Sequence, residues 1–297
     1  MIQVRQFRHT DLEQIEKLDK MLWLQLKWNK TFHSEDAFVA FEGERIVGAA
    51  ALYYDRTFYY LWRTEGHIPK YHMGISYVVE ETREDKLIIK CALFERMKVH
   101  LRKWRERYPD KKMSMRICCN HTEIEETEFM LSQGFTIEQV IMVMRFDLTR
   151  EIPKYEIPKE VEIGVHNFDG DGMERYMKAN ELGFDNLQDA EDELRFELMA
   201  DNAKVFTATV NGEVVSSTTT WSFGEGHSAT ENVFTIPAYR RKNIGIETVC
   251  TALRSLKEDG EKEATLTVFG SNLAAIQMYL KIGYHLQYYL MEMHYTL

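Results

Sequence analysis

Apolar and polar residues alternate at residues 2–8, a pattern that predicts a strand. The segment that follows predicts one amphipathic helix, because its apolar residues recur on a single helical face and His9-Thr10-Asp11 can cap its start. These apolar positions are Leu12, Ile15, Leu18 and Leu22. The chain is therefore expected to open with a strand and a helix.

Two β-hairpins are predicted at similar places in the two halves of the chain. The first joins two apolar, β-branched runs through Glu42-Gly43-Glu44. The second joins similar runs through Asn211-Gly212, a pair suited to the positive φ angles of a tight turn. This recurrence indicates an internal repeat.

The closing stretches of the two halves also resemble one another. The first half ends in MLSQGFTIEQVIMVMRFDL and the second in YLKIGYHLQYYLMEMHYTL. Each stretch predicts a helix stopped by glycine and then two strands. Between them, residues 149–159 contain Pro153 and Pro158 and lack apolar periodicity, which is typical of a linker. We therefore expect one domain at residues 1–148 and another at 160–297.

Each half shows the same order of elements: strand, helices, hairpin, strand, helix, strand, helix and two final strands. That order predicts a mixed α/β (α+β) layer built around one sheet in each half. The chain has 297 residues, of which 44% are hydrophobic, and this is more than one ordinary domain core requires. Two tandem domains of the same fold class are the simplest interpretation.

Charge and cysteine content exclude several classes of function. The 37 lysine and arginine residues are outnumbered by 47 acidic residues, and the net charge of -10 disfavours broad binding to nucleic acid or an anionic membrane. No apolar run approaches the roughly 20 residues of a membrane span, and the N-terminus is charged where a signal peptide would be apolar. The four cysteines show neither zinc spacing nor the density of a disulfide scaffold. We expect a cytoplasmic protein without a bound metal.

The stretch from Glu231 to Ile246 predicts a strand, a basic turn and the start of a helix. Such a turn presents backbone N–H groups at the positive end of a helix, where a pyrophosphate can accept several hydrogen bonds. Gly245 permits close approach, and three consecutive cations, Arg240 to Lys242, add charge. The alternative interpretation is a solvated basic turn without a ligand.

A second motif follows, in which a strand leads through Asn272 into a short helix that ends at Gly283. Together the two motifs resemble the GNAT superfamily of N-acetyltransferases, whose hallmarks are a turn with the pattern R-x-x-G-x-G/A and a later helix with the pattern N-x-x-A-x-x-x-Y-x-x-x-G-F/Y. The turn matches at Arg240 and Gly245 but has Asn243 where the family usually has glycine. The helix matches at Asn272, Ala275, Tyr279, Gly283 and Tyr284.

This resemblance implies two tandem GNAT folds and a site for acetyl-CoA, a co-substrate, between two splayed parallel strands of the second half. The pantetheine arm would pair with the first of these strands, and the pyrophosphate would lie on the basic turn. Because asparagine tolerates a left-handed backbone, we expect Asn243 to weaken cofactor binding without abolishing it. The implied cofactor-binding residues are Val233, Phe234, Thr235, Arg240, Arg241, Lys242, Asn243, Ile244, Gly245, Ile246 and Asn272.

The resemblance also implies two catalytic residues. Tyr279 occupies the place of the family's general acid, which protonates the departing CoA thiolate; its alternative role is a core aromatic. Glu231 lies on the strand that many members use for the general base, and a surface carboxylate is the alternative. Thr267 stands where some N-terminal acetyltransferases carry a glutamate, so their particular mechanism is not expected here.

The first half departs further from the family pattern. Its counterpart of the basic turn, residues 79–89, has no glycine and carries acids that would repel phosphates. Met130 stands in the place of the tyrosine. We therefore interpret residues 1–148 as a degenerate, catalytically silent copy.

Three hypotheses about function remain open from the sequence. The first is an N-acetyltransferase that moves acetyl from acetyl-CoA to a primary amine by direct attack, with Cys250 packed rather than nucleophilic. The second is a silent CoA-binding sensor or scaffold, and the third is a peptide-binding adaptor without CoA affinity. The acceptor would be a small amine or a peptide N-terminus, and the protein would be a monomer or homodimer. The acids between Asp185 and Glu193 are consistent with a cationic acceptor, and a solvated helix face is the alternative interpretation.

Overall fold

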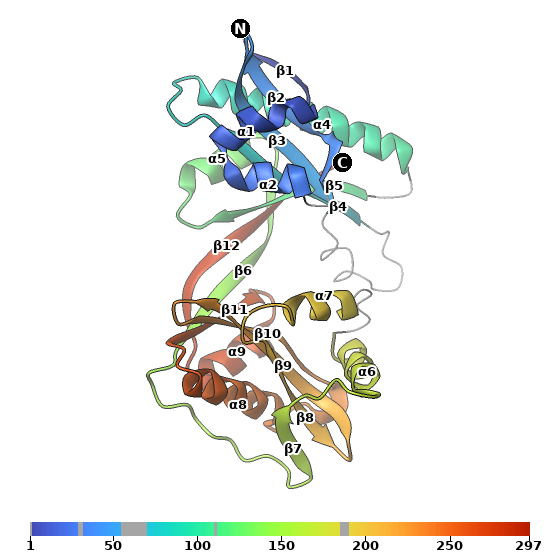
Figure 1. Ribbon diagram of the computed structural model, residues 1–297, viewed down its shortest axis with the longest axis vertical. Coiled ribbons are helices and arrows are strands. Elements are labelled where there is room, and N and C mark those ends of the chain that lie inside the picture. Colours follow the sequence, from blue (N-terminus) through green and yellow to red (C-terminus); the bar gives the residue numbers. More distant parts are fainter. Residues whose placement is uncertain (1, 29–31, 55–69, 110–111, 185–189) are drawn as a thin grey trace. The chain divides into compact units, whose positions relative to one another are not determined.

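The computed structural model describes residues 2–28, 32–54, 70–109, 112–184 and 190–297 (Figure 1). The chain divides into two compact units. Unit 1 comprises Met1–Glu138 together with Met291–Leu297, and unit 2 comprises Gln139–Leu290. None of the described helices is both long and apolar enough to cross a membrane.

Unit 1 contains most of the elements of the first half. They are β1 (Gln3–Gln6), η1 (His9–Asp11), α1 (Leu12–Leu18), α2 (Lys20–Trp28), β2 (Phe32–Glu42), β3 (Arg45–Tyr54), β4 (Lys70–Val79), α4 (Lys86–Arg107), β5 (Lys112–Asn120), α5 (Ile124–Ser132) and the start of β6 (Thr136–Asp147). The last strand of the chain, β12 (His285–Thr296), completes its sheet, whose order is β1-β2-β3-β4-β5-β12.

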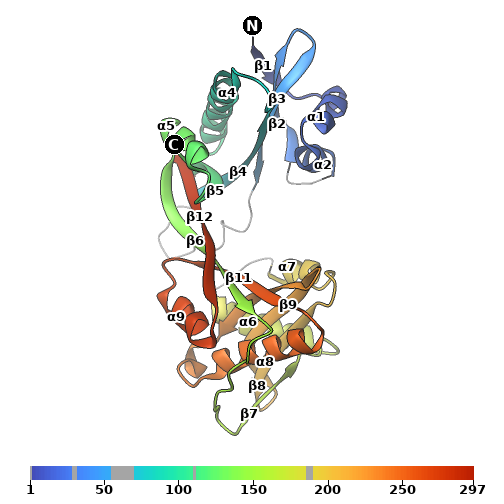
Figure 2. The same ribbon diagram turned by 90° about the vertical axis from the view of Figure 1, so that its left-hand side faces the viewer.

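The two faces of the unit 1 sheet are covered by different helices (Figure 2). Along β2, Phe38 packs in a cluster with Leu93 of α4, whereas its neighbour Val39 packs in a second cluster with Ile15 of α1. Successive strand residues point to opposite faces, so one apolar run serves both clusters. The sheet is thus the middle layer of three.

The prediction of a single amphipathic helix after β1 is wrong, because the chain breaks at Asp19 into α1 and α2. Asp19 has an extended backbone with φ of -157°, and its side chain accepts a hydrogen bond of 2.6 Å from the N–H of Leu22. This bond satisfies a free donor at the start of α2, as N-terminal caps do. The apolar spacing continues across the break, which is why periodicity alone predicts one helix.

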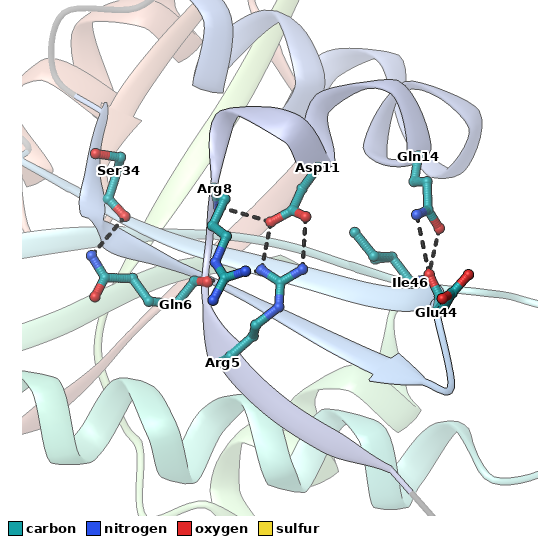
Figure 3. A network of polar contacts seen from close by, with 8 residues as sticks. All are labelled: Arg5, Gln6, Arg8, Asp11, Gln14, Ser34, Glu44 and Ile46. Carbon is teal, nitrogen blue, oxygen red and sulfur yellow. Dashed lines mark hydrogen bonds and ion pairs between the residues drawn. The ribbon is translucent and has the colours of Figure 1, made fainter.

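A buried carboxylate fixes the junction between β1 and the first helices (Figure 3). Both oxygens of Asp11 accept hydrogen bonds of 2.7 Å from the Arg5 guanidinium, and the N–H of Arg8 donates to one of them at 2.7 Å. Nearby, the side chain of Gln14 binds the backbone of Glu44 and Ile46. The network ties the N-terminal strand and helix to the β2–β3 hairpin.

Unit 2 repeats the order of elements of unit 1. It contains β7 (Val161–Val165), α6 (Gly172–Phe184), α7 (Ala190–Glu197), β8 (Lys204–Val210), β9 (Glu213–Gly224), β10 (His227–Thr235), η2 (Pro237–Tyr239), α8 (Ile244–Glu258), β11 (Glu263–Phe269) and α9 (Leu273–Ile282). Its strand order is β12-β6-β11-β10-β9-β8-β7. The internal repeat and both hairpins are therefore confirmed; Asn211 and Gly212 have φ of 51° and 82° in the β8–β9 turn.

The prediction of two strands after each closing helix is wrong, since each half ends in one 12-residue strand. From Ile141 to Asp147, β6 pairs antiparallel with β11 in unit 2, whereas the end of β12 belongs to unit 1. The compact units therefore differ from the expected domains 1–148 and 160–297. The reason is that each long strand pairs with strands from the other half of the chain, β6 with β11 and β12 and β12 with β5 and β6, which local pattern does not reveal.

Candidate active site

Two parallel strands of unit 2 separate part of the way along their length. Strand β10 pairs with β11 only from His227–Glu263 to Ala229–Thr265. Further along, β10 stays paired with β9 as far as Thr235, and β11 stays paired with β6 as far as Phe269. Because each strand stays paired with its outer neighbour, the facing edges of β10 and β11 separate. This separation is the splay that the family resemblance implies.

A bulge in β10 accompanies this splay. Between Glu231 and Phe234 the register with β9 shifts, and Asn232 adopts the left-handed conformation with φ of 48°. Such a bulge redirects neighbouring side chains and frees backbone groups from the ladder. Glu231 and Val233, the expected base and a pantetheine-pairing residue, flank this bulge.

The turn after β10 has two residues in the left-handed region. Arg241 has φ of 66° and Asn243 has φ of 58°, and Asn243 is the residue from which α8 begins. The N–H groups of the first helical turn have no partner within a helix, and the helix dipole makes this end positive. These groups belong to Ile244, Gly245 and Ile246, so the turn has the chemistry of an anion site.

Gly245 is required by packing within the protein. A Cβ atom at this position would lie 2.5 Å from Oγ1 of Thr235 on β10. Thr235 Oγ1 is itself held by Ser216 Oγ of β9 at 2.9 Å, and Ser216 also donates to the carbonyl of Phe234 at 2.6 Å. The absence of a side chain therefore brings the start of α8 directly against the end of β10.

The splay, the turn and helix α9 enclose a cavity of about 740 Å³ in unit 2. Its lining includes every expected cofactor-binding residue except Lys242, whose ammonium lies over the ring of Tyr239 at 5.0 Å. Tyr279 also lines the cavity, whereas Glu231 does not. The lining residues are Gly183, Phe184, Val233, Phe234, Thr235, Tyr239, Arg240, Arg241, Asn243, Ile244, Gly245, Ile246, Asn272, Ala274, Ala275, Gln277, Met278, Tyr279 and Lys281.

The cavity favours an anionic ligand. Its described lining carries the cations Arg240, Arg241 and Lys281 and no carboxylate. Arg240 is partly engaged, since its guanidinium donates to the carbonyls of Thr235 at 2.8 Å and Gly183 at 3.3 Å. Arg240 therefore attaches the turn to the end of β10. Arg241 and Lys281 are the other two cations of the lining.

Tyr279 and Glu231 interact electrostatically across the splay. Burial first, and then the charge of Glu231, raises the pKa of Tyr279, so its hydroxyl keeps its proton at neutral pH. Burial, followed by the charge of Glu197 on α7, raises the pKa of Glu231 to about 8. A carboxyl group with this pKa can accept and release a proton near neutral pH. Glu197 is held beside the bulge by a hydrogen bond of 2.5 Å from the side chain of Asn232.

Gly183, Phe184 and Ser216 take part in the site without any sequence signal that distinguishes them. A Cβ atom at Gly183 would lie 2.6 Å from the ring of Phe234, so α6 packs directly on β10. Gly183 lies in the last turn of α6 and matches no motif, which is why sequence analysis misses it. Cys250 lies in the core behind the site, and burial together with the charge of Glu247 raises the pKa of its thiol to about 12. A thiol with this pKa is a poor nucleophile near neutral pH.

The acidic segment expected near the acceptor falls mainly outside the described residues, which omit 185–189. Of the rest, Glu191 pairs with Arg195 one helical turn later, at 2.6 Å, on the exposed surface of α7. Over the described ranges, no group of three or more histidine, cysteine or acidic side chains is arranged to hold a metal ion.

In the corresponding region of unit 1, polar contacts join side chains of three elements. Glu126 of α5 accepts hydrogen bonds from the Tyr77 hydroxyl of β4 and, at 2.6 Å, from Lys90 of α4. The equivalent elements of unit 2 (α9, β10 and α8) surround the cavity. In the turn before α4, Arg83 is paired with Asp85 at 2.7 Å. Met130, in the place of the tyrosine, is fully buried.

Comparison with known proteins agrees with the geometry of unit 2. Residues 173–284 match the model of the family described as "Acetyltransferase (GNAT) family". This range includes the splay, the turn and helix α9. None of the curated proteins compared matches the sequence.

Several solved structures share the fold of the whole chain. A GCN5-related N-acetyltransferase from Sphaerobacter thermophilus has a TM-score of 0.67 at 14% identity, with coverage of 99% of this chain and 95% of that one. A tandem GNAT protein from the clavulanic acid biosynthesis pathway has a TM-score of 0.64 at 13% identity, with coverage of 100% and 98%. A glucosamine N-acetyltransferase region of a fungal multi-domain β-N-acetylglucosaminidase has a TM-score of 0.70 at 16% identity and covers 99% of this chain and 38% of that one.

Proposed function

Residues 173–284 belong to the GNAT family of acetyltransferases, and on this premise we propose that the chain moves an acetyl group from acetyl-CoA to a primary amine. The chain has two GNAT folds in tandem. We assign the reaction to unit 2. The observation that carries this proposal is the cavity, which combines a helix N-terminus, unpaired strand edges and cations with a buried tyrosine hydroxyl.

The residues present are chemically suited to acyl-CoA. The pyrophosphate would lie on the N–H groups of Ile244 to Ile246, near Arg241, because a helix N-terminus stabilises negative charge. The pantetheine arm would follow the splayed edge of β10 from Thr235 towards Val233. Its thioester would then reach the part of the splay at which Tyr279 and Glu231 interact.

Removal of a proton from the acceptor is the first chemical requirement. A primary amine with a pKa of about 10.4 is protonated at neutral pH, and its neutral form costs roughly 4–5 kcal/mol. Glu231, whose pKa is about 8, would take this proton directly or through a water and later release it to solvent. The like charge of Glu197 would favour a cationic acceptor beside it.

The amine nitrogen would then attack the thioester carbonyl carbon and form a tetrahedral intermediate. Its collapse breaks the C–S bond, and the thiolate takes a proton from the Tyr279 hydroxyl. The surplus proton on nitrogen restores the tyrosine, so that the net reaction converts amine and acetyl-CoA into amide and free CoA. Because burial raises the pKa of Tyr279, its hydroxyl is protonated when the thiolate departs.

A panel of amines tested with acetyl-CoA, with free thiol as the readout, checks this proposal. The panel should contain small amines, amino sugars, amino acids and peptides with free N-termini. We expect thiol release that depends on both substrates and an acetylated amine confirmed by mass spectrometry. CoA binding without turnover of any amine would instead favour a sensor or scaffold, and no CoA binding would favour the adaptor hypothesis.

A further inference from the structure

Residues 149–157, which the sequence predicts to be part of a linker, lie along helix α8 (Figure 2). We call this segment the strap. At its first end, the ammonium of Lys257, in the last turn of α8, donates to the carbonyls of Thr149 at 3.3 Å and Arg150 at 2.7 Å. Three residues earlier on α8, Arg254 donates to the carbonyl of Pro153 at 3.1 Å.

The other end of the strap reaches the anion-binding turn. The N–H of Tyr155 donates to Oε2 of Glu247 at 2.7 Å, in the first turn of α8. The carbonyl of Glu156 accepts a hydrogen bond of 3.2 Å from Nδ2 of Asn243. As residue numbers rise along the strap they fall along α8, so the two segments run antiparallel.

The length of the strap matches the length of the helix. An extended chain covers about 3.3 Å per residue, so the stretch from Arg150 to Glu156 spans up to about 20 Å. A helix rises about 1.5 Å per residue, so the stretch from Asn243 to Lys257 spans about 21 Å. The strap therefore has little slack, and its fixed first end determines the position of its second end.

Proline and apolar side chains keep the strap extended and attached. Pro153 lacks an N–H group and favours an extended conformation at the residue before it. Ile152 and Tyr155 pack on the core cluster of α8, α9 and β11, and Ile157 packs on the cluster that contains Ile244. The Tyr155 hydroxyl also donates to the carbonyl of Lys281 at 3.0 Å.

The strap also compensates a buried charge beside the anion site. Glu247 is only 5% exposed and lies one turn from the start of α8. Its oxygens bind the N–H of Tyr155 and, at 2.5 Å, the guanidinium of Arg254. An uncompensated carboxylate here would oppose the binding of a phosphate at the same helix end.

Asn243 is the residue through which the strap can act on the site. It lines the cavity, its backbone is left-handed, and its side chain is turned towards Glu156. We propose that the strap, through Asn243 and Tyr155, positions the turn at the start of α8 for the phosphate groups of acyl-CoA. Asparagine at this place is then part of a positioning device that replaces the conformational role of glycine, and it supports CoA binding, contrary to the weakening expected from the sequence alone. The proposal rests on the proposed function, since it names what holds the cofactor site in place.

Titration calorimetry with CoA tests the contribution of the asparagine side chain. Asn243→Gly keeps the left-handed backbone accessible and removes the hydrogen bond to the strap. A bond of this kind corresponds to about a two- to tenfold change in affinity, and we expect CoA to bind more weakly by that factor. Asn211→Gly is the matched control, because Asn211 is left-handed in a turn that does not line the cavity. Its CoA affinity should equal that of the wild type.

A double-mutant cycle tests whether Asn243 acts through the strap. Tyr155→Ala removes the ring and hydroxyl that anchor the second end of the strap, and its own CoA affinity should fall. Combined with Asn243→Gly, its effect should be less than additive, because both changes release the same contact. Additive effects would overturn the proposal, since they would mean that Asn243 acts on the ligand independently. Melting temperatures measured without ligand show whether each variant is folded.

The probe pantetheine, which has no phosphate, separates positioning of the phosphate turn from general damage to the cavity. Ligand-observed NMR should show that Asn243→Gly binds pantetheine as the wild type does. An equal loss for pantetheine and CoA, or a CoA affinity of Asn243→Gly at or above the wild-type value, would overturn the proposal. Failure of the wild type to bind CoA would reject the proposed function itself, and is thus distinguishable from failure of the strap alone.

Discussion

Helix α8 and strand β10 meet at Gly245 and Thr235, where a Cβ atom on residue 245 would lie 2.5 Å from the threonine Oγ1. This distance is far below van der Waals contact, and Thr235 is itself held by Ser216. The glycine of the turn is therefore fixed by the packing of the site as well as by access for a ligand.

We predict that Gly245→Ala destabilises the protein by about 1–3 kcal/mol and weakens CoA binding, because the start of α8 must move away from β10. Urea denaturation and CoA titration measure the two effects. Gly164→Ala is the matched control, since a Cβ atom there meets nothing within 4 Å. Adding Thr235→Ala to Gly245→Ala should recover part of both losses. If the double variant is no better than Gly245→Ala, steric conflict with Thr235 is not the cause.

Replacement of Tyr279 by phenylalanine should lower turnover much more than acetyl-CoA affinity. The hydroxyl is assigned to a thiolate whose charge develops only during the reaction, and proton donation of this kind is typically worth about 10²–10⁴-fold. Steady-state kinetics with an identified acceptor, under conditions where chemistry limits the rate, measures the effect. Tyr284→Phe is the control: Tyr284 is buried nearby, binds Thr230 at 2.9 Å and does not line the cavity. Wild-type turnover in Tyr279→Phe would make this tyrosine a core aromatic.

The pH dependence of kcat/KM should report the proximity of Glu197 to Glu231. Burial and the charge of Glu197 raise the pKa of Glu231 to about 8, so the activity of the base increases as pH rises through this region. Glu197→Gln removes the like charge, which lowers the pKa of Glu231 and shifts the rising limb to lower pH. The groups that interact with Glu231 from other elements, Tyr279 and Tyr284, are unchanged in this variant.

Glu191→Gln controls for the loss of any carboxylate from α7, because Glu191 is paired with Arg195 on the surface. Its pH profile should coincide with that of the wild type. The same acceptor is used throughout, so its own ionisation contributes equally. If the rising limb of the pH profile lies at the same pH in Glu197→Gln as in the wild type, Glu231 is not the titrating base.

One CoA should bind per chain, and it should bind in unit 2. In unit 1, Glu126 binds Tyr77 and Lys90. These three residues lie on the counterparts of the elements that surround the cavity in unit 2. Calorimetry should give a stoichiometry of one CoA per chain. Gly245→Glu should abolish CoA binding, and Glu126→Gln should leave the stoichiometry unchanged. A stoichiometry of two, or residual tight binding in Gly245→Glu, would show that unit 1 also holds CoA.

Local sequence alone predicts much of the fold. Glycine after each closing helix, at residues 134 and 283, adopts positive φ as expected, and Asn211-Gly212 forms the predicted turn. These features depend on a few neighbouring residues, because the backbone angles that those residues allow are set locally and do not need tertiary contacts. The recurrence of such signals is enough to reveal two copies of one fold.

Part of the candidate site was likewise predicted from the sequence, and part was not. The basic turn, Asn272 and Tyr279 follow from spacing along the chain, because a strand, a turn and a helix place them at fixed offsets. Gly183 and Glu197 have no such signal, since their roles depend on packing against Phe234 and on proximity to Glu231. Those contacts join residues far apart in sequence.

Sequence by itself thus determined the repeated α/β fold, the turn chemistry and the family motifs of the second half. Tertiary structure decided that β6 and β12 each contribute to both units, that residues 149–157 lie along α8, and that a neighbouring carboxylate raises the pKa of Glu231. The physical reason is that different interactions act over different distances along the chain. Backbone propensities and periodicity act over a few residues, whereas strand pairing, close packing and charge–charge interaction depend on distances in space that only the folded chain defines.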